Sequence, residues 1–125
     1  MANLAYMCKS LNRYEEAEKY YKIAIEHGSA AAMNNLASMY QDLNRYDDAE
    51  KYFKMAIDKN LDVALDNIAL MYKSLEKYDK AEKYFKMSIE KGISRSMNNL
   101  GYMYYLLKKY KNAEKYLKMA VEKGY

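Results

Sequence analysis

The segment LNRYDDAEKYFKMAIDKN at residues 43–60 decides the fold, because it occurs in three further copies along the chain. The other copies begin at Leu11, Leu75 and Leu107, so that neighbouring copies are 32 residues apart. A second block precedes each copy, and its four versions read ANLAYMCKS, NNLASMYQD, DNIALMYKS and NNLGYMYYL. The chain is therefore predicted to hold four two-block repeats, at 1–31, 32–63, 64–95 and 96–125.

Both blocks have the apolar spacing of a helix. In the second repeat Leu36, Ala37 and Tyr40 share one helix face, and Ala49 and Phe53 do so in the following block. The short link between the blocks requires their helices to be antiparallel neighbours. We predict an all-α fold, an α-solenoid of four helix-turn-helix repeats with eight antiparallel helices, in a single domain over 1–125.

Residue types that end and begin helices fall at the same spacing. Gly or Asn, which accept a left-handed helix C-cap, follows each second helix at Gly28, Asn60, Gly92 and Gly124. Residues placed to cap the next helix come next, at Ser29, Asp62 and Ser94. These positions predict where one repeat ends and the next begins.

Composition excludes several classes of protein. Half of the 125 residues are hydrophobic (51%), Pro is absent and Gly occurs four times, which argues against disordered, collagen-like and all-β chains. One Cys and one His exclude an internal disulfide and the usual zinc ligand sets. No apolar run approaches the roughly 20 residues that span a bilayer. We expect an intracellular, cytoplasmic protein with no metal, cofactor or membrane partner.

The net charge of +4 is unevenly distributed. Residues 1–63 hold 8 basic and 10 acidic side chains (−2), and residues 64–125 hold 13 and 7 (+6). A basic half attracts acidic partners through long-range electrostatics. Most of these lysines alternate with glutamates along one helix face, which is typical of a solvated surface.

The order of small and large residues resembles the tetratricopeptide repeat, a helix-turn-helix array that binds proteins. The matching positions in the second repeat are Leu36, Ala37, Tyr40, Ala49, Phe53 and Ala56. The junction AIEHGSAAAMNNLASMY at 24–40 is similar to SEL-one-like repeats, and the spacing is 32 where the family has 34. The resemblance implies a right-handed superhelix whose first helices, here called A helices, line a concave groove for an extended peptide or a partner helix.

One asparagine recurs in every A helix. A carboxamide offers the donor and the acceptor that a peptide group requires, and the pattern resembles the asparagine ladder of O-linked N-acetylglucosamine transferases. The four positions are Asn3, Asn35, Asn67 and Asn99. The alternative is that each amide bonds a neighbouring helix and only fixes repeat register.

Other A-helix side chains outside the packing stripe complete the expected groove. They are Tyr6, Asn34, Ser38, Asp66, Leu70, Lys73, Arg95, Asn98, Tyr102 and Tyr105. By contrast, one tyrosine opens every second helix and is expected to fill the seam between helices, at Tyr14, Tyr46, Tyr78 and Tyr110.

Function follows from the expected groove. No paired carboxylates in a sheltered site, nucleophile–base set or phosphate loop is evident, so no enzyme activity is expected. A scaffold that binds a protein or peptide is the first hypothesis. Single-stranded RNA binding in a pentatricopeptide-like manner and a purely structural, self-stacking module remain alternatives.

Terminal repeats without a polar cap expose an apolar face, which predicts a fragment of a longer array or end-to-end self-association.

Overall fold

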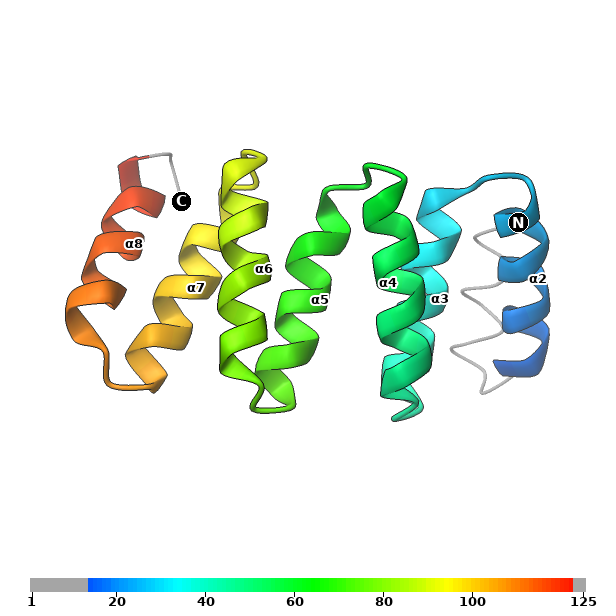
Figure 1. Cartoon of the computed structure of the whole chain (residues 1–125), viewed down its shortest axis with the longest axis horizontal. Coiled ribbons are helices and arrows are strands. Elements are labelled where there is room, and N and C mark those ends of the chain that lie inside the picture. Colours follow the sequence, from blue (N-terminus) through cyan, green and yellow to red (C-terminus); the bar gives the residue numbers. More distant parts are fainter. Residues whose placement is uncertain (1–13, 123–125) are drawn as a thin grey trace. The chain divides into compact units, whose positions relative to one another are not determined.

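The computed structural model describes residues 14–122, which contain seven α-helices and no strand (Figure 1). The helices are α2 (Tyr14–Glu26), α3 (Ala30–Asp42), α4 (Tyr46–Asp58), α5 (Val63–Ser74), α6 (Tyr78–Glu90), α7 (Arg95–Leu106) and α8 (Tyr110–Glu122). Within this range the all-α prediction is confirmed. The expected first A helix lies outside the described residues. Eight helices, four repeats, the 32-residue period and the right-handed superhelix therefore stay predictions.

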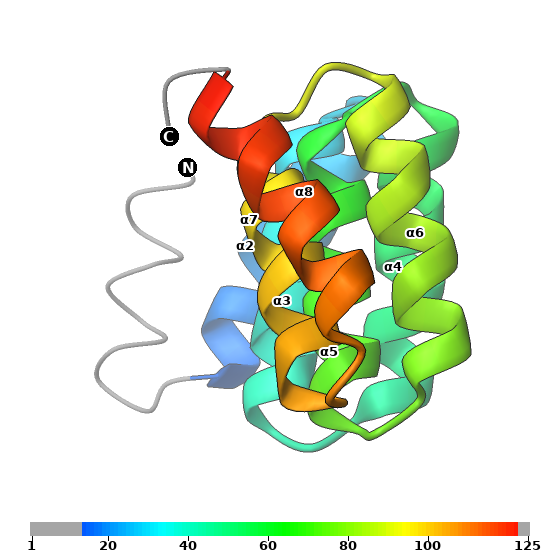
Figure 2. The same ribbon diagram turned by 90° about the vertical axis from the view of Figure 1, so that its left-hand side faces the viewer.

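The chain divides into two compact units, residues 1–64 (unit 1) and 65–125 (unit 2), and each is described by itself. A single domain over 1–125 remains a prediction. In unit 1, α2, α3 and α4 follow one another in antiparallel order, and in unit 2 α5 to α8 do the same (Figure 1). Figure 2 looks from the α8 end and shows α7 and α6 on different sides of unit 2. The A helices described are α3, α5 and α7, and we call α2, α4, α6 and α8 the B helices.

Small and large apolar side chains alternate in the core of each unit. In unit 1, Leu36 and Ala37 of α3 are fully buried, as is Phe53 of α4. In unit 2, Phe85 of α6 and Leu100 of α7 are fully buried as well. Small residues let helix axes approach closely, and each aromatic ring fills the space that they leave.

Gly101 of α7 shows how close that approach becomes. A Cβ atom at this position would lie 2.8 Å from Cγ of Leu117 in α8, closer than real Cβ contacts allow. The matching position of α3 holds Ala37, which faces a helix carrying Phe53. The pair Gly101 and Leu117 therefore brings α8 closer to α7 than an alanine would permit.

The ends of α2, α4 and α6 confirm three of the predicted C-caps, and the fourth, Gly124, lies outside the described residues. The φ angles are +84° at Gly28, +65° at Asn60 and +86° at Gly92, all in the left-handed region. Ser29 caps α3 as expected, because its Oγ accepts a hydrogen bond of 3.1 Å from the Ala32 amide. The expected cap at Ser94 is wrong: its backbone is already helical, and its side chain makes no capping bond. A side-chain cap requires the extended backbone that Ser29 has.

The turns from A to B helices also enter the left-handed region, which the sequence analysis did not anticipate. Asn44, Glu76 and Lys108 have φ angles of 62°, 61° and 62°. Asn tolerates this region because its short side chain bonds locally. Here Asn44 Oδ1 accepts a hydrogen bond of 2.8 Å from the Tyr46 hydroxyl. Glu76 and Lys108 occupy the same conformation without being residue types that favour it.

In each unit a buried tyrosine of one A helix, α3 or α7, bonds to the preceding B helix. In unit 1 the Tyr40 hydroxyl of α3 donates to Glu18 of α2, and in unit 2 the Tyr104 hydroxyl of α7 donates to Glu82 of α6 over 2.7 Å. Burial, with the hydrogen bond to the carboxylate as a second cause, raises the pKa of both tyrosines well above the usual value. Both hydroxyls therefore stay protonated and keep donating at neutral pH.

Candidate functional site

Helix α7 has a buried side and an exposed side. Leu100 and Tyr104 lie in the core, whereas Tyr102 and Tyr105 are 51% and 54% exposed. Asn98 is also exposed, and the Arg95 side chain is 43% exposed. The four exposed residues are three or four positions apart, so they form one stripe along the helix. We call Arg95, Asn98, Tyr102 and Tyr105 the α7 stripe.

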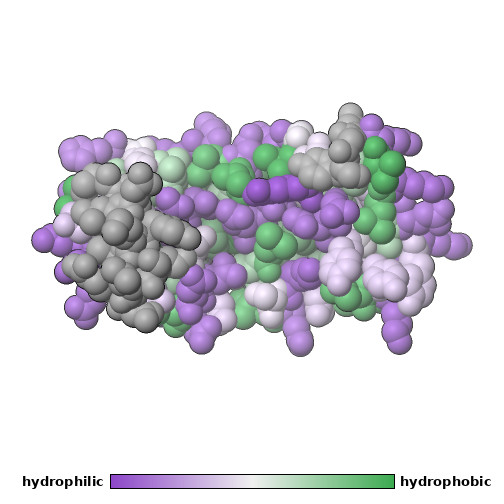
Figure 3. Space-filling view, turned by 180° about the vertical axis from the view of Figure 1, so that it is seen from behind, coloured by the Kyte–Doolittle hydropathy of each residue, from purple (hydrophilic) through white to green (hydrophobic). Residues whose placement is uncertain are grey.

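Contacts between aromatic rings connect the C-terminal part of this stripe to the start of α8. The Tyr102 and Tyr105 rings are 6.4 Å apart and nearly parallel, and Tyr105 meets Tyr110 edge-on at 5.8 Å. Tyr110 and Leu106 are themselves 58% and 51% exposed. The expectation that Tyr110 fills a helix seam is therefore wrong. We call Tyr102, Tyr105, Leu106 and Tyr110 the tyrosine patch, and near-white groups gather over this end of unit 2 in Figure 3.

Lys73 of α5 reaches the tyrosine patch from the neighbouring A helix. Its ammonium group lies 5.0 Å from the centre of the Tyr102 ring, within the range of a cation–π contact. Leu70, one turn earlier on α5, is half-buried. Unit 2 thus brings together five of the predicted groove residues: Lys73, Arg95, Asn98, Tyr102 and Tyr105.

Beneath the α7 stripe lies a buried polar cluster centred on Asp66 of α5, which is 1% exposed. Ser96 Oγ donates to Asp66 Oδ1 over 2.7 Å, and Asn99 Nδ2 lies 3.1 and 3.2 Å from the two carboxylate oxygens. Arg95 Nε forms an ion pair with Asp66 at 3.0 Å. The two hydroxyl oxygens of Ser88 in α6 and Ser96 are 2.6 Å apart. This cluster links α5, α6 and α7.

The cluster bears on the predicted asparagine ladder. The Asn99 amide is occupied by Asp66, as expected if the asparagine bonds a neighbouring helix. Asn34 and Asn67 also take part in interactions within the protein. Asn35 and Ser38 are half-buried in α3 of unit 1. Ligand contact by the ladder stays a prediction, and two of the expected groove residues, Asn3 and Tyr6, lie outside the described residues.

The sequence analysis missed Ser88 and Ser96. Alanine stands 32 residues earlier in both cases, at Ala56 and Ala64. Asp66 likewise replaces Asn34, and Arg95 replaces Val63. The available signal was the change of three apolar residues to polar ones at the α6–α7 junction, together with the charge introduced at Asp66, because a buried hydroxyl needs a partner that an alanine does not.

Other kinds of site receive no support from the described part of the chain. Within residues 14–122 no three His, Cys, Asp or Glu side chains come close enough together to hold a metal ion. In the same range, no helix has the length and apolar character that crossing a membrane demands.

Comparisons with known proteins agree with the helical-hairpin arrangement. A family profile described as tetratricopeptide repeat matches residues 29–60, 63–92 and 94–123, and a second profile with the same description matches residues 1–29. No curated protein gives a significant match to the chain.

Solved structures with similar folds include MamA, BtubC (BKLC) from P. vanneervenii and PilF of Pseudomonas aeruginosa. MamA is 24% identical with a TM-score of 0.81, covering 98% of this chain and 75% of its own. BtubC is 22% identical with a TM-score of 0.78, and PilF is 20% identical with a TM-score of 0.81; each match covers 99% of this chain. The match spans 63% of the BtubC chain and 60% of the PilF chain. At these identities the likeness shows the fold alone.

Proposed function

The chain belongs to the tetratricopeptide repeat family, and from this premise we propose that it binds a partner protein through the exposed side of its A helices. Proteins of this repeat type are in general interaction scaffolds without enzymatic activity. The ligand proposed is an extended peptide or a helix of the partner. The α7 stripe and Lys73 contact it in unit 2, and Asn35 and Ser38 are the matching candidates in unit 1.

The observation that carries this proposal is the exposure of Tyr102 and Tyr105 on α7. Large aromatic side chains are rarely left half in water by a fold that could bury them, and they dominate the energetics of protein interfaces. Both tyrosines project from the helix face opposite the core. The α7 stripe also combines polar and aromatic groups, since Arg95 and Asn98 supply hydrogen-bond donors at its N-terminal end.

A phage-displayed library of short random peptides, selected against the full chain, tests the proposal. A selected peptide is then added to 15N-labelled protein, and amide shifts are followed by NMR. We expect the largest shifts in α5 and α7, with Asn98→Ala weakening binding and the α8 variant Glu114→Gln leaving it unchanged. Shifts confined to the B helices, or the absence of any selected peptide, would contradict the proposal.

A further inference from the structure

The combination of Tyr102, Tyr105 and Leu106 in the tyrosine patch occurs in one A helix of the sequence. The positions of Tyr102, Tyr105 and Leu106 in α7 are held in α3 by Ser38, Gln41 and Asp42. Helix α3 forms with these polar residues, so the fold itself does not require exposed aromatic or aliphatic side chains here. Their presence in α7 therefore calls for an explanation outside folding, and a contiguous exposed apolar patch commonly marks a binding site.

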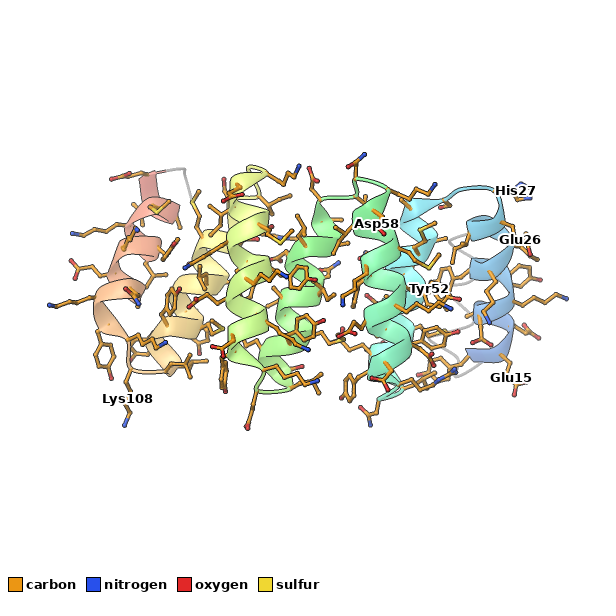
Figure 4. All side chains as sticks on the ribbon, in the orientation of Figure 1. Glu15, Glu26, His27, Tyr52, Asp58 and Lys108 are labelled. Carbon is orange, nitrogen blue, oxygen red and sulfur yellow. The ribbon has the colours of Figure 1, made fainter. Side chains whose placement is uncertain are left out.

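The charge around the patch is also specific to this repeat. Lys108, Lys109 and Lys111 flank Tyr110, and a hollow of about 240 Å³ is lined by Lys109, Tyr110, Lys111 and Asn112. Figure 4 shows Lys108 at the turn between α7 and α8, with its side chain directed away from the helices. Lys73 lies over Tyr102, and the other three lysines are close to Tyr110 in sequence. The first acidic residue along α8, Glu114, is paired with Lys118 at 3.0 Å.

The preceding repeat provides a direct comparison within unit 2. The corresponding turn holds Glu76, Lys77, Tyr78, Asp79 and Lys80, which line a hollow of about 350 Å³. The two acidic and two basic side chains of that hollow sum to zero, whereas Lys108, Lys109 and Lys111 sum to +3. The same turn geometry thus occurs with balanced and with strongly basic charge, and only the basic version adjoins exposed tyrosines.

The arrangement of the rings bears on the class of ligand. Single-stranded nucleic acid binds by stacking its bases on free aromatic faces along a basic path. In the tyrosine patch Tyr102 already contacts Lys73 and Tyr105, and Tyr105 contacts Tyr102 and Tyr110. The rings therefore form one continuous surface, which suits a side chain laid across it better than bases inserted between its members.

We propose that the tyrosine patch and Lys73, Lys108, Lys109 and Lys111 form a docking surface for an acidic peptide segment that carries an aromatic or large aliphatic side chain. The apolar side chain of the partner lies on the rings, and its flanking carboxylates face the lysines. This inference rests on the proposed function and names the chemistry of the partner. It places the anchoring contacts in unit 2, at the end of α7 and the start of α8.

The same peptide selection tests this inference through the composition of the selected sequences. We expect enrichment in Asp and Glu next to Phe, Leu or Tyr. The variant Tyr102→Ser/Tyr105→Gln/Leu106→Asp transfers the residues of α3 to α7 and should weaken binding of a selected peptide by at least about tenfold, the range of tyrosine hot spots. The variant Lys108→Glu/Lys111→Asp transfers the charges of residues 76 and 79 and should weaken binding to a similar extent, more so at low salt.

Because both variants use side chains already present at matching positions of this chain, they should fold; circular dichroism checks that they do. Glu114→Gln/Lys118→Gln, which removes the exposed α8 pair, is the matched control and should bind as the original chain does. Peptides that bind the A helices but lack acidic residues would overturn this inference and leave the proposed function standing. Peptides that bind both patch variants as tightly as the original chain would overturn this inference and also remove the support that Tyr102 and Tyr105 give to the proposed function. Binding of oligouridylate in preference to every acidic peptide would overturn it in favour of RNA.

Discussion

At the residue scale, the protonation of the buried residues Tyr40 and Tyr104 affects the stability of the fold, because each hydroxyl donates a hydrogen bond to a glutamate. Tyr104 is 2% exposed, and its hydroxyl donates to Glu82 of the preceding helix. Its ring also contacts Tyr116 at 5.8 Å, and Lys109 lies 6.0 Å from its centre. A carboxylate accepts this bond only while the tyrosine keeps its proton.

Stability should therefore fall at alkaline pH. Burial and Glu82 raise the pKa of Tyr104 in the folded state above the unfolded value of about 10. The stabilisation is fully present below that value and is lost as pH rises through the folded-state pKa. Tyr104→Phe should lower the free energy of unfolding by roughly 1 kcal/mol near neutral pH and flatten its decline above pH ~10. Urea titrations at several pH values measure this, with Tyr102→Phe, a surface substitution, as the control. If the free energy of unfolding of Tyr104→Phe fell above pH ~10 as steeply as that of the original chain, the prediction would be refuted.

The Asp66 cluster gives a second prediction at this scale. Asp66→Ala leaves Arg95, Ser96 and Asn99 without their common acceptor, which should lower the free energy of unfolding by about 2 kcal/mol. Replacing the cluster residues that differ from the preceding junction should restore the free energy of unfolding to within about 1 kcal/mol, because this variant removes the buried charge together with Arg95 and both hydroxyls and leaves the asparagine introduced at position 66 to pair with Asn99. That variant is Asp66→Asn/Ser88→Ala/Arg95→Val/Ser96→Ala. Equal stability of Asp66→Ala and the original chain in urea would show that the cluster contributes nothing.

At the scale of the element, helix boundaries are set by residues in the left-handed region. Gly and Asn fill this role after the B helices, at little conformational cost. Glu76 and Lys108 fill it in the turns after α5 and α7, where each carries a Cβ atom that the conformation disfavours. These turns are thus less favourable than the turn at Asn44.

Glycine in such a turn should raise stability. We expect Glu76→Gly to increase the free energy of unfolding by about 0.5 kcal/mol, because relief of left-handed strain exceeds the added freedom of the unfolded chain. The matched control, Asn44→Gly, should change it less, since Asn tolerates this region already and Asn44 bonds Tyr46. Thermal unfolding of both variants and of the original chain measures these differences in stability. A Glu76→Gly variant less stable than the original chain would disprove the strain argument.

At the scale of the whole molecule, an exposed apolar face of α8 is a candidate surface for self-association. Val121 is 69% exposed and, with Leu117, lines a hollow of about 420 Å³ edged by Glu114, Lys118 and Glu122. In α6 the matching residues are Ile89, which is half-buried, and Phe85, which is fully buried. The face that the core covers in α6 is thus open in α8. We propose it as the surface for the self-association expected from the sequence.

Self-association through this face should depend on protein concentration. Sedimentation velocity over a range of concentrations should show a rising average mass, and Val121→Glu should abolish that rise because it places a charge in the apolar contact. Glu114→Gln at the edge of the hollow should leave the rise largely intact. A mass that stays monomeric at every concentration would exclude this mode of assembly.

Much of the fold could be predicted because it rests on local patterns. Apolar spacing sets the helices, and Gly28, Asn60 and Gly92 set their ends; neither depends on distant residues. Ser94 shows where this reasoning stops. Its type suited a cap, but its backbone conformation, which a pattern of residue types does not reveal, ruled the cap out.

The sequence by itself determined the helices, their order and the repeat family, since these follow from periodic spacing and turn residues repeated along the chain. Only the tertiary structure decided which polar side chains remain available. Asp66 and Asn99, both predicted groove residues, are hydrogen-bonded to each other, because burial of a charge requires a partner. Tyr110 looked like a seam residue but lies exposed beside Tyr105. Both outcomes depend on distances between separate helices, and residue spacing along the chain does not encode those distances.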